Sequence, residues 1–229
     1  MAFSSFSSIH SACMGGGPAP PNIAGEVFAL SFGTSTLPAK DKYGYNLTNS
    51  SSSTGSGMMA PSIYNDATRG YVLNVSSAGL ATNYIPNVVS FTRACWYYNK
   101  TTSPTTTPNL FSTSTTPIWF SNNTNVSVQI NAFTGTLITD PTNRGIGSWV
   151  HYAFTYNGTS IIIYVNGVSV ISGTYSYSTA DTTSVNIGYY INGNYNPSAY
   201  MDNIHFYNRA LSASEVASLY NYENINPKK

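Results

Sequence analysis

Hydrophobic and polar residues alternate over short stretches through most of this chain, which is the pattern of β-strands with one buried face. Val126, Val128 and Ile130, for example, alternate with polar residues. Such stretches are separated by Gly, Pro, Asn and Ser, which favour turns and loops. From Gly25 onward we therefore expect a chain that is built almost entirely of strands.

The clearest predicted motif is a three-stranded meander in the C-terminal half. Trp149–Tyr156 is expected to form a strand, and an Asn-Gly turn at 157–158 leads to a return strand over Ser160–Val165. A second Asn-Gly pair at 166–167 turns the chain again into Val168–Ile171. Asn and Gly both tolerate positive φ, which tight hairpin turns require.

One helix is predicted, close to the C-terminus. Ser212 and Glu215 fit a capping box, in which the Ser hydroxyl accepts from the N–H of the Glu and the carboxylate reaches back. Val216 and Leu219 then share an apolar face, and Pro227 lies beyond the expected end. Many short strands and one short terminal helix predict an all-β fold, a β-sandwich.

The chain divides into three predicted segments. Residues 1–22 form a Ser/Gly/Pro-rich arm with no core of its own, which only a partner can order. Residues 23–222 form the folded domain, and residues 223–229 form a C-terminal tail. Two stretches inside the domain, Ser50–Gly57 and Thr101–Pro117, are rich in Ser, Thr, Gly and Pro and are predicted to be loops.

The composition excludes several classes of protein. Only 7% of the residues are charged and the net charge is +1, so a nucleic-acid binder with clustered Lys and Arg is excluded. No apolar stretch approaches the roughly 20 residues that span a bilayer, and residues 1–11 lack the basic and apolar regions of a secretory signal. Cys13 and Cys95 are expected to be free thiols made in a reducing compartment, with one disulfide as the alternative.

Several segments resemble a known family. Gly147–Gly158 and Ile163–Gly167 resemble the central hairpin of laminin-G-like jelly rolls, which belong to the concanavalin A-like lectin/glucanase superfamily. Tyr200–Ser212 is similar to the last strand of that family and its turn into a closing helix. Asp41–Thr48 is similar to its opening loop, and Gly70–Tyr98 to its next two strands.

The resemblance covers about residues 24–222 and implies a jelly-roll β-sandwich of two curved antiparallel sheets packed face to face. Glucanases of this fold place their acids at alternate positions of one strand, so that the acids face one cleft. The acidic residues of this chain lie at least eight positions apart, so that pattern is missing and we expect no enzyme. His151 and His205 are expected to be hydrogen-bonded strand residues.

Asp202 is the most informative acidic residue. Strand alternation places it on the same face as Ile204 and Phe206, pointing inward near a sheet rim. A buried carboxylate must be paired, hydrogen-bonded or metal-bound. In the resembled family, a calcium ion sometimes joins a carboxylate of the last strand to backbone oxygens near the first strand. Asp202 is therefore expected to hold loop N–H groups or Arg209; the alternative is that it is a ligand of a structural calcium ion. No other cofactor is expected.

A Tyr- and Asn-rich segment is the candidate ligand-binding surface, because lectin sites combine aromatic faces with Asn and Asp side chains. The candidate residues are Tyr189, Tyr190, Asn192, Asn194 and Tyr195, extended by Asn196 and Tyr200. The same composition suits a protein partner equally well, since Tyr offers a large contact area at low entropic cost. The three Trp residues (Trp96, Trp119 and Trp149) lie in strand contexts and are expected in the core.

These features predict a non-enzymatic structural or interaction protein. The first hypothesis is a minor capsid or surface component located in the virion, whose partners are neighbouring virion or assembly proteins. An interface of uncharged polar groups avoids the cost of stripping water from ions, and an arm can order on a neighbouring subunit. The alternative is a carbohydrate-binding, lectin-like module that attaches to glycans and is extracellular or at the cell surface. A glycan hydrolase or lyase is a weaker third hypothesis.

Overall fold

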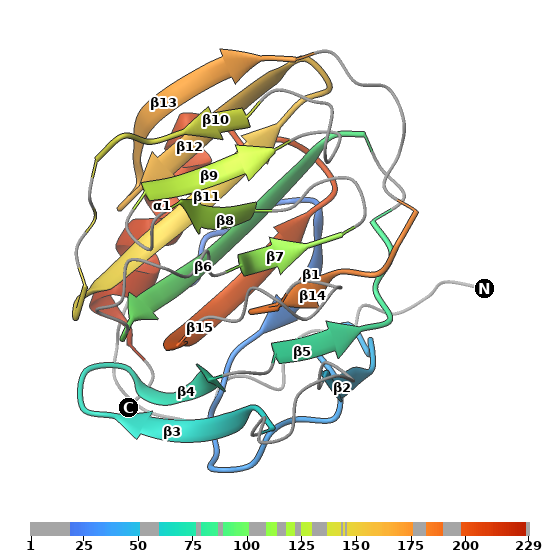
Figure 1. The fold of residues 1–229 in the computed structure, drawn as a ribbon, viewed down its shortest axis with the longest axis vertical. Helices are drawn as coiled ribbons and strands as arrows, with labels where there is room; N and C mark the ends of the chain where they lie inside the picture. The colour runs from blue at the N-terminus through green and yellow to red at the C-terminus, as the bar shows by residue number, and fades with distance from the viewer. Residues whose placement is uncertain are drawn as a thin grey trace.

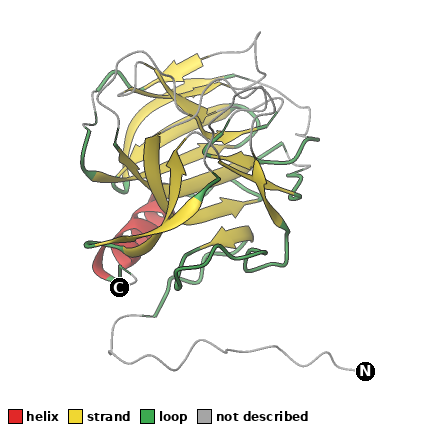
Figure 2. Cartoon of the chain, turned by 60° about the horizontal axis from the view of Figure 1, so that its bottom comes forward, coloured by secondary structure: helices red, strands yellow, loops and turns green. Residues whose placement is uncertain are grey.

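Two antiparallel sheets pack face to face, and a single described helix lies on the outer face of one of them (Figures 1 and 2). This arrangement is that of a computed structural model. It describes residues 19–50, 60–76, 79–86, 89–100, 109–113, 118–121, 125–129, 137–142, 144, 146–175, 182–189 and 198–227. The predicted all-β sandwich with a short C-terminal helix is confirmed.

The larger sheet, which carries the helix and is called the helix-side sheet here, has β6 and β15 at its centre. Its strands follow the order β13 (Val168–Thr174), β12 (Ser160–Val165), β11 (Trp149–Tyr156), β6 (Phe91–Asn99), β15 (Ser198–Tyr207), β4 (Gly70–Ser76) and β3 (Ser62–Asp66). β1 (Glu26–Leu30) pairs with the second half of β15.

The smaller sheet covers the other side of the core. Its strands follow the order β10 (Leu137–Thr139), β9 (Asn125–Gln129), β8 (Ile118–Ser121), β7 (Asn109–Ser112), β14 (Asn186–Ile187), β5 (Gly79–Thr82) and β2 (Leu47–Ser50).

β7 corrects one prediction, because it lies inside Thr101–Pro117, which was expected to be a loop. Leu110 and Phe111 are fully buried, and the strand pairs with β8 and β14. Two apolar residues in a polar, Pro-rich stretch give little sequence signal, but their burial between the sheets stabilises a strand here. Residues 101–108 lie outside the described part of the chain, as do residues 51–59 of the other predicted loop.

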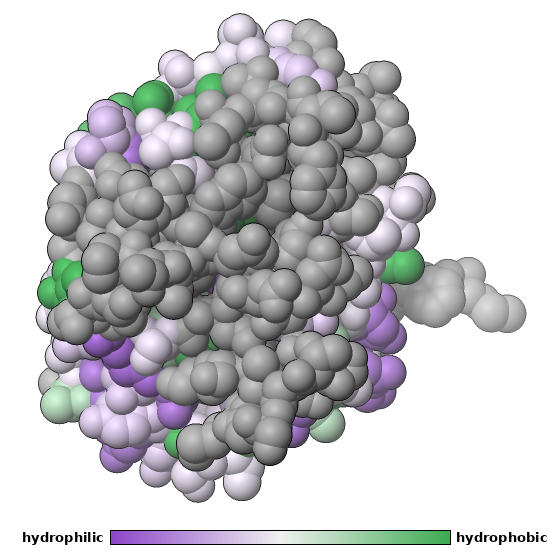
Figure 3. Space-filling view, in the orientation of Figure 1, coloured by the Kyte–Doolittle hydropathy of each residue, from purple (hydrophilic) through white to green (hydrophobic). Residues whose placement is uncertain are grey.

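Aromatic side chains fill the core between the two sheets. Tyr97, Tyr152, Phe154 and Phe206 face this core and are at most 2% exposed. Large apolar side chains that leave water supply most of the free energy that drives folding. Few large hydrophobic side chains are exposed in the described part of the chain, and on the face seen in Figure 3 they form small separate groups.

The predicted meander is confirmed as β11, β12 and β13, which pair in order. At the second Asn-Gly turn, Asn166 has φ 50° and Gly167 has φ 79°; at the first turn only Gly158 has positive φ. These are the backbone conformations that made Asn-Gly a turn signal.

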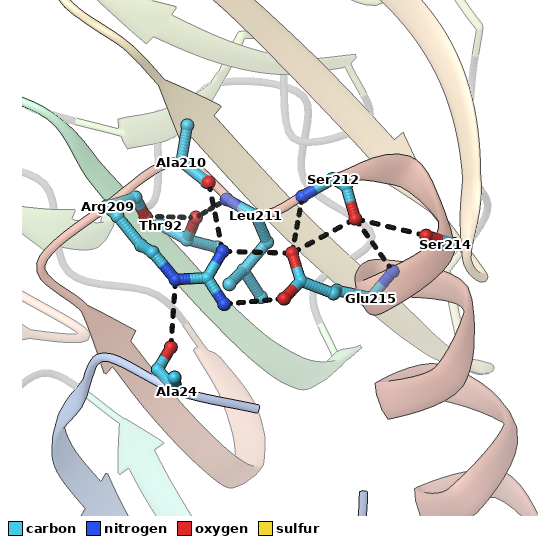
Figure 4. A network of polar contacts seen from close by, with 8 residues as sticks. All are labelled: Ala24, Thr92, Arg209, Ala210, Leu211, Ser212, Ser214 and Glu215. Atoms are coloured by element: carbon cyan, nitrogen blue, oxygen red, sulfur yellow. Dashed lines mark hydrogen bonds and ion pairs between the residues drawn. The ribbon is translucent and has the colours of Figure 1, made fainter. Parts of the chain in front are cut away.

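The helix α1 (Ala213–Ile225) begins with the predicted capping box. Ser212 accepts from the N–H of Glu215, and the Glu215 carboxylate accepts from the N–H of Ser212. Arg209 forms two bonds to the same carboxylate and one to the carbonyl oxygen of Ala24, which ties the start of the domain to the start of the helix (Figure 4). The helix continues through Ile225 and so includes residues 223–225 of the segment predicted as a tail.

No helix within the described residues is long and apolar enough to cross a membrane. α1 instead packs its Val216 and Leu219 on Ala94, Ala153 and Tyr207 of the helix-side sheet, a second and smaller apolar cluster.

A polar anchor beside this cluster joins the helix to the sheet. The Glu223 carboxylate of α1 accepts from Nε1 of Trp96 at 2.8 Å and lies 2.7 Å from Nε2 of His205. His205 Nδ1 lies 2.6 Å from Oε1 of Glu26 in β1. His151 is fully buried, with Nε2 3.7 Å from Glu223. Neither ring nitrogen of His151 makes a hydrogen bond within the described residues.

The two histidines are perturbed in opposite directions. Burial alone would lower the pKa of His205, but Glu223 and Glu26 outweigh it and raise the pKa to about 9. Burial lowers the pKa of His151 to about 4. His205 is therefore an imidazolium that bridges two carboxylates, and His151 is a neutral aromatic side chain.

These shifts predict a stability maximum near pH 6.5, the usual pKa of an unfolded histidine. As the pH rises from 6.5 to 9, only folded His205 keeps its proton, so stability falls. As the pH falls from 6.5 to 4, only unfolded His151 takes up a proton, so stability falls again. Each slope approaches about 1.4 kcal/mol per pH unit and is measured by chemical unfolding across this range.

Single variants separate the two slopes. His151→Phe is expected to flatten the acid side alone, and His205→Asn the alkaline side alone. A wild-type stability that stays constant between pH 6.5 and 9 would contradict the assignment of His205.

Candidate functional site

Three aromatic residues lie side by side on the outer face of the helix-side sheet. Tyr200 in β15 is directly opposite Tyr98 in β6, and Tyr98 is directly opposite Trp149 in β11. Residues in register on neighbouring antiparallel strands project from the same face. Their sequence neighbours Tyr97 and Met201 point into the core, so strand alternation sends this row outward.

Tyr64 of β3 completes the group, which we call the aromatic platform (Tyr64, Tyr98, Trp149 and Tyr200). The rings of Tyr64 and Tyr200 stack with centroids 4.5 Å apart and planes 4° apart. Tyr98 has its ring centroid 5.8 Å from that of Tyr200 and 5.6 Å from that of Trp149. Tyr64 is 45% exposed, and the other three are partly buried. The platform is thus open to solvent while its rings are held by one another.

A cavity of about 300 Å³ opens beside the platform. It is lined by Tyr64, Tyr98 and Tyr200 together with Asp66, Asn99, Lys100, Ile146 and Gly147. Polar groups therefore border the aromatic faces.

Local hydrogen bonds fix the acidic and basic groups of this cavity. Oδ1 of Asp66 accepts from Nε1 of Trp149 at 3.2 Å and from two backbone N–H groups of its own turn. Nζ of Lys100 donates to Oδ1 of Asn74 at 2.6 Å and lies 4.2 Å from the centre of the Tyr200 ring. Burial lowers the pKa of Lys100, and burial together with Tyr64 raises that of Tyr200. The site therefore places a hydrogen-bond acceptor, Asp66, beside Trp149 and a donor, Lys100, beside Tyr200.

Asp202 lies on this outer face as well, contrary to the prediction that it points inward with Ile204 and Phe206. A β-bulge inserts one extra residue between Asp202, opposite Trp96, and His205, opposite Ala94. Asn203 in the bulge has φ 44°. The bulge reverses the alternation, so that Ile204 and Phe206 face the core and Asp202 faces the helix side.

Asp202 is paired, but with a residue that the sequence did not indicate. Its Oδ2 accepts from Nε of Arg69 at 2.9 Å, and both side chains are at least 97% buried. The Arg69 guanidinium also lies 4.1 Å from the Trp96 ring centre. Burial raises the pKa of Asp202, and Arg69 opposes that shift. Arg209, one of the partners that the sequence suggested, binds Glu215 instead.

The surroundings of Asp202 do not fit a calcium site. A guanidinium already occupies one carboxylate oxygen, and a second cation would be repelled by it. Among the described residues, no three His, Cys, Asp or Glu side chains are grouped so that they could hold a metal ion.

Most of the predicted sugar-binding segment lies outside the described residues, namely Tyr190, Asn192, Asn194, Tyr195 and Asn196. Tyr189 is described and lies at the smaller sheet, where its carbonyl oxygen accepts from Ser112 Oγ at 2.6 Å. Tyr200 alone joins the aromatic platform.

Sequence reasoning missed Tyr64, Tyr98 and Trp149 as site residues. Trp149 was expected in the core, but it is partly exposed on the outer face. Trp96 is buried as expected, although under the helix and not between the sheets, and the side chain of Trp119 is not described. Alternation within Trp149–Tyr156 was the available signal, but it does not say which face is inward.

A second and larger cavity, which we call the polar cavity, lies between β1, the end of β15 and α1. Its volume is about 500 Å³, and its lining includes Pro20, Ile23, Glu26, Lys42, Tyr43, His205, Tyr207, Tyr222 and Glu223. Glu26 and Glu223 thus meet at His205 although they are far apart in the sequence.

The two carboxylates of the polar cavity are engaged as ion-pair partners. Burial alone would raise the pKa of Glu26, but bonds from His205, Lys42 and Tyr43 lower it to about 2. Glu26 therefore carries no proton at neutral pH, whereas a glycosidase needs a carboxylic acid that can protonate the leaving group.

Comparisons with known proteins agree with this architecture. The model of the concanavalin A-like lectin/glucanases superfamily matches residues 68–217, more than half of the chain. No curated protein matches the sequence.

Similar solved structures are binding domains. Domain 4 of AbnA, a GH43 extracellular arabinanase from Geobacillus stearothermophilus solved with arabinotriose, is 18% identical, with a TM-score of 0.65 over 85% of this chain and 98% of that one. The binding domain of Paraclostridial Mosquitocidal Protein 1 is also 18% identical, with a TM-score of 0.64 over 86% of this chain and 52% of that one.

A third similar structure is that of botulinum neurotoxin type C, whose cell entry depends on two ganglioside molecules; it is 14% identical, with a TM-score of 0.64 over 86% of this chain and 51% of that one. The chain spans about half the length of the two toxin chains.

These likenesses concern the fold, and the virion assignment stays a prediction. By its family match and its two-sheet architecture, the chain belongs to the concanavalin A-like lectin/glucanase superfamily.

Proposed function

We propose that this domain is a carbohydrate-binding module that holds a glycan against the aromatic platform. The proposal rests on one observation. The in-register rings of Tyr200, Tyr98 and Trp149 form a row beside an open cavity, and Asp66 is part of the wall of that cavity. Binding sites for small ligands combine apolar and aromatic walls with a few polar groups that fix the orientation of the ligand.

The chemistry of a sugar matches this arrangement. The C–H groups on one side of a pyranose or furanose ring form an apolar surface that lies well on an aromatic face, while its hydroxyl groups need hydrogen bonds. Asp66 offers acceptor oxygens and Lys100 a donor. Tyr hydroxyl groups at the platform can serve as either.

The dimensions favour a chain of sugars over a single ring. Neighbouring strands lie about 4.8 Å apart, so the row across β15, β6 and β11 is roughly 10 Å long. The side chains stand on a sheet and stack on one another, so little conformational entropy is lost when a ligand binds.

The comparisons support this function over the virion hypothesis and over catalysis. The arabinanase domain was solved with arabinotriose, and the botulinum structure concerns gangliosides. Both of these ligands contain sugars. For this chain we propose a non-enzymatic module whose partners are glycans, acting at an extracellular or cell-surface location. The capsid role stays a prediction from the sequence.

Replacing Tyr200 with Ala is expected to weaken glycan binding about tenfold or more, because Tyr200 contacts both Tyr64 and Tyr98 inside the platform and aromatic contacts within a binding site dominate its binding energy. Tyr200→Phe keeps the ring and should bind within about twofold of wild type. Binding is measured on a glycan array and then by calorimetric titration with the best-bound oligosaccharide.

Tyr222→Ala is the matched control, since Tyr222 is a partly buried tyrosine that lines the other cavity. Tyr190→Ala and Tyr195→Ala test the segment that the sequence indicated. If those two variants lose binding while Tyr200→Ala keeps it, the platform is not the site. Failure of the folded wild-type protein to bind any glycan would overturn the function itself.

A further inference from the structure

An ammonium group already sits in the polar cavity, and it belongs to the chain itself. Nζ of Lys42 donates to Oε2 of Glu26 at 2.6 Å and lies 5.1 Å from the centre of the Tyr43 ring. The Tyr43 hydroxyl donates to the same carboxylate oxygen at 2.6 Å. A fixed carboxylate next to an aromatic face binds a primary ammonium group well. The carboxylate attracts the positive charge, and the negative face of the ring adds a cation–π attraction.

The carboxylate is held in place, whereas the ammonium group is not. The Glu26 side chain is only 15% exposed, and His205 holds its other oxygen. The Lys42 side chain is 64% exposed. Exposed ion pairs are weak, and a lysine regains side-chain entropy when it is released. A ligand can therefore displace Lys42 while Glu26 stays in position.

A tyrosine of the sheet also lines the same cavity. Tyr207 lines the cavity and is 3% exposed. Burial and the nearby charges of Glu26 and Glu223 raise the pKa of Tyr207, so the hydroxyl keeps its proton. A phenolic O–H can both donate and accept a hydrogen bond. The cavity wall therefore offers a bound ligand one further polar group.

We propose that the polar cavity binds a ligand that carries a primary ammonium group, which takes the place of Lys42 on Glu26. With Lys42 displaced, two carboxylates, Glu26 and Glu223, face one imidazolium, His205, so the cavity carries one net negative charge. That charge matches a single cation. Tyr43, Tyr207 and Tyr222 provide aromatic walls for the rest of the ligand. This site is separate from the aromatic platform and does not depend on glycan binding there.

The test uses n-butylammonium, which has the four-carbon chain and head group of the Lys42 side chain. NMR titration of the full chain should give saturable shifts of the His205 ring signals. Lys42→Ala removes the internal competitor and is expected to bind the probe about fivefold more tightly than wild type. n-Butanol, which has the same chain without the charge, should give no saturable shift.

Three variants complete the test. Lys40→Ala is the matched control, because Lys40 is an exposed lysine near by that does not line the cavity, and its affinity should equal that of wild type. Glu26→Gln in the Lys42→Ala background should lose binding. Tyr207→Phe in that background should weaken binding of the probe. This variant tests the same cavity if the Glu26 variant does not fold.

The proposal fails if neither wild type nor Lys42→Ala gives a saturable shift, or if both bind the probe equally. It also fails if n-butanol reproduces the effect. Tyr200→Ala should leave n-butylammonium binding unchanged, which separates this result from that of the glycan experiments.

Discussion

The extra residue in β15 determines which groups lie on the outer face of the helix-side sheet. Because the bulge at Asn203 lies between them, Asp202 and His205 project to the same side although they are three positions apart. Asp202 then meets Arg69, and His205 meets Glu26 and Glu223. A regular strand would send one of the two into the aromatic core, where a charged group has no partner and its burial is costly.

The few charges of this protein are used mainly for internal positioning. Arg69–Asp202 holds the turn before β4 against the sheet, and Glu223–His205 holds α1. Buried pairs of this kind add little net stability, since desolvation offsets the attraction, but breaking one leaves an uncompensated charge. Because only 7% of the residues are charged, uncharged polar residues must make most of the contacts with water. Such a surface suits ligands that form many neutral hydrogen bonds.

Two candidate sites share the outer face of one sheet. The aromatic platform lies across β3, β15, β6 and β11, and the polar cavity lies where β1, β15 and α1 meet. β15 contributes to both, through Tyr200 at one end and through His205 and Tyr207 at the other. A central strand, packed on the core by Met201, Ile204 and Phe206, gives both sites a rigid base. A rigid base holds the side chains of a binding site in position before the ligand arrives, which favours binding.

Local features of the structure could be predicted from the sequence alone. The Asn-Gly turns, the meander and the capping box at Ser212 depend on neighbours a few positions apart, so short patterns report them. The candidate site could not be predicted in this way. Tyr98, Trp149 and Tyr200 are adjacent only because β6 lies between β11 and β15, and alternation does not tell which face of a strand is covered.

The sequence by itself thus determined the class of fold, the turns and the helix start, because these follow from backbone preferences and the period of apolar residues. Only the tertiary structure decided the partner of Asp202, the strand in the Pro-rich stretch and the meeting of Glu26 with Glu223 at His205. These depend on strand order and on one bulge, and no short stretch of sequence encodes which distant residues will share a face.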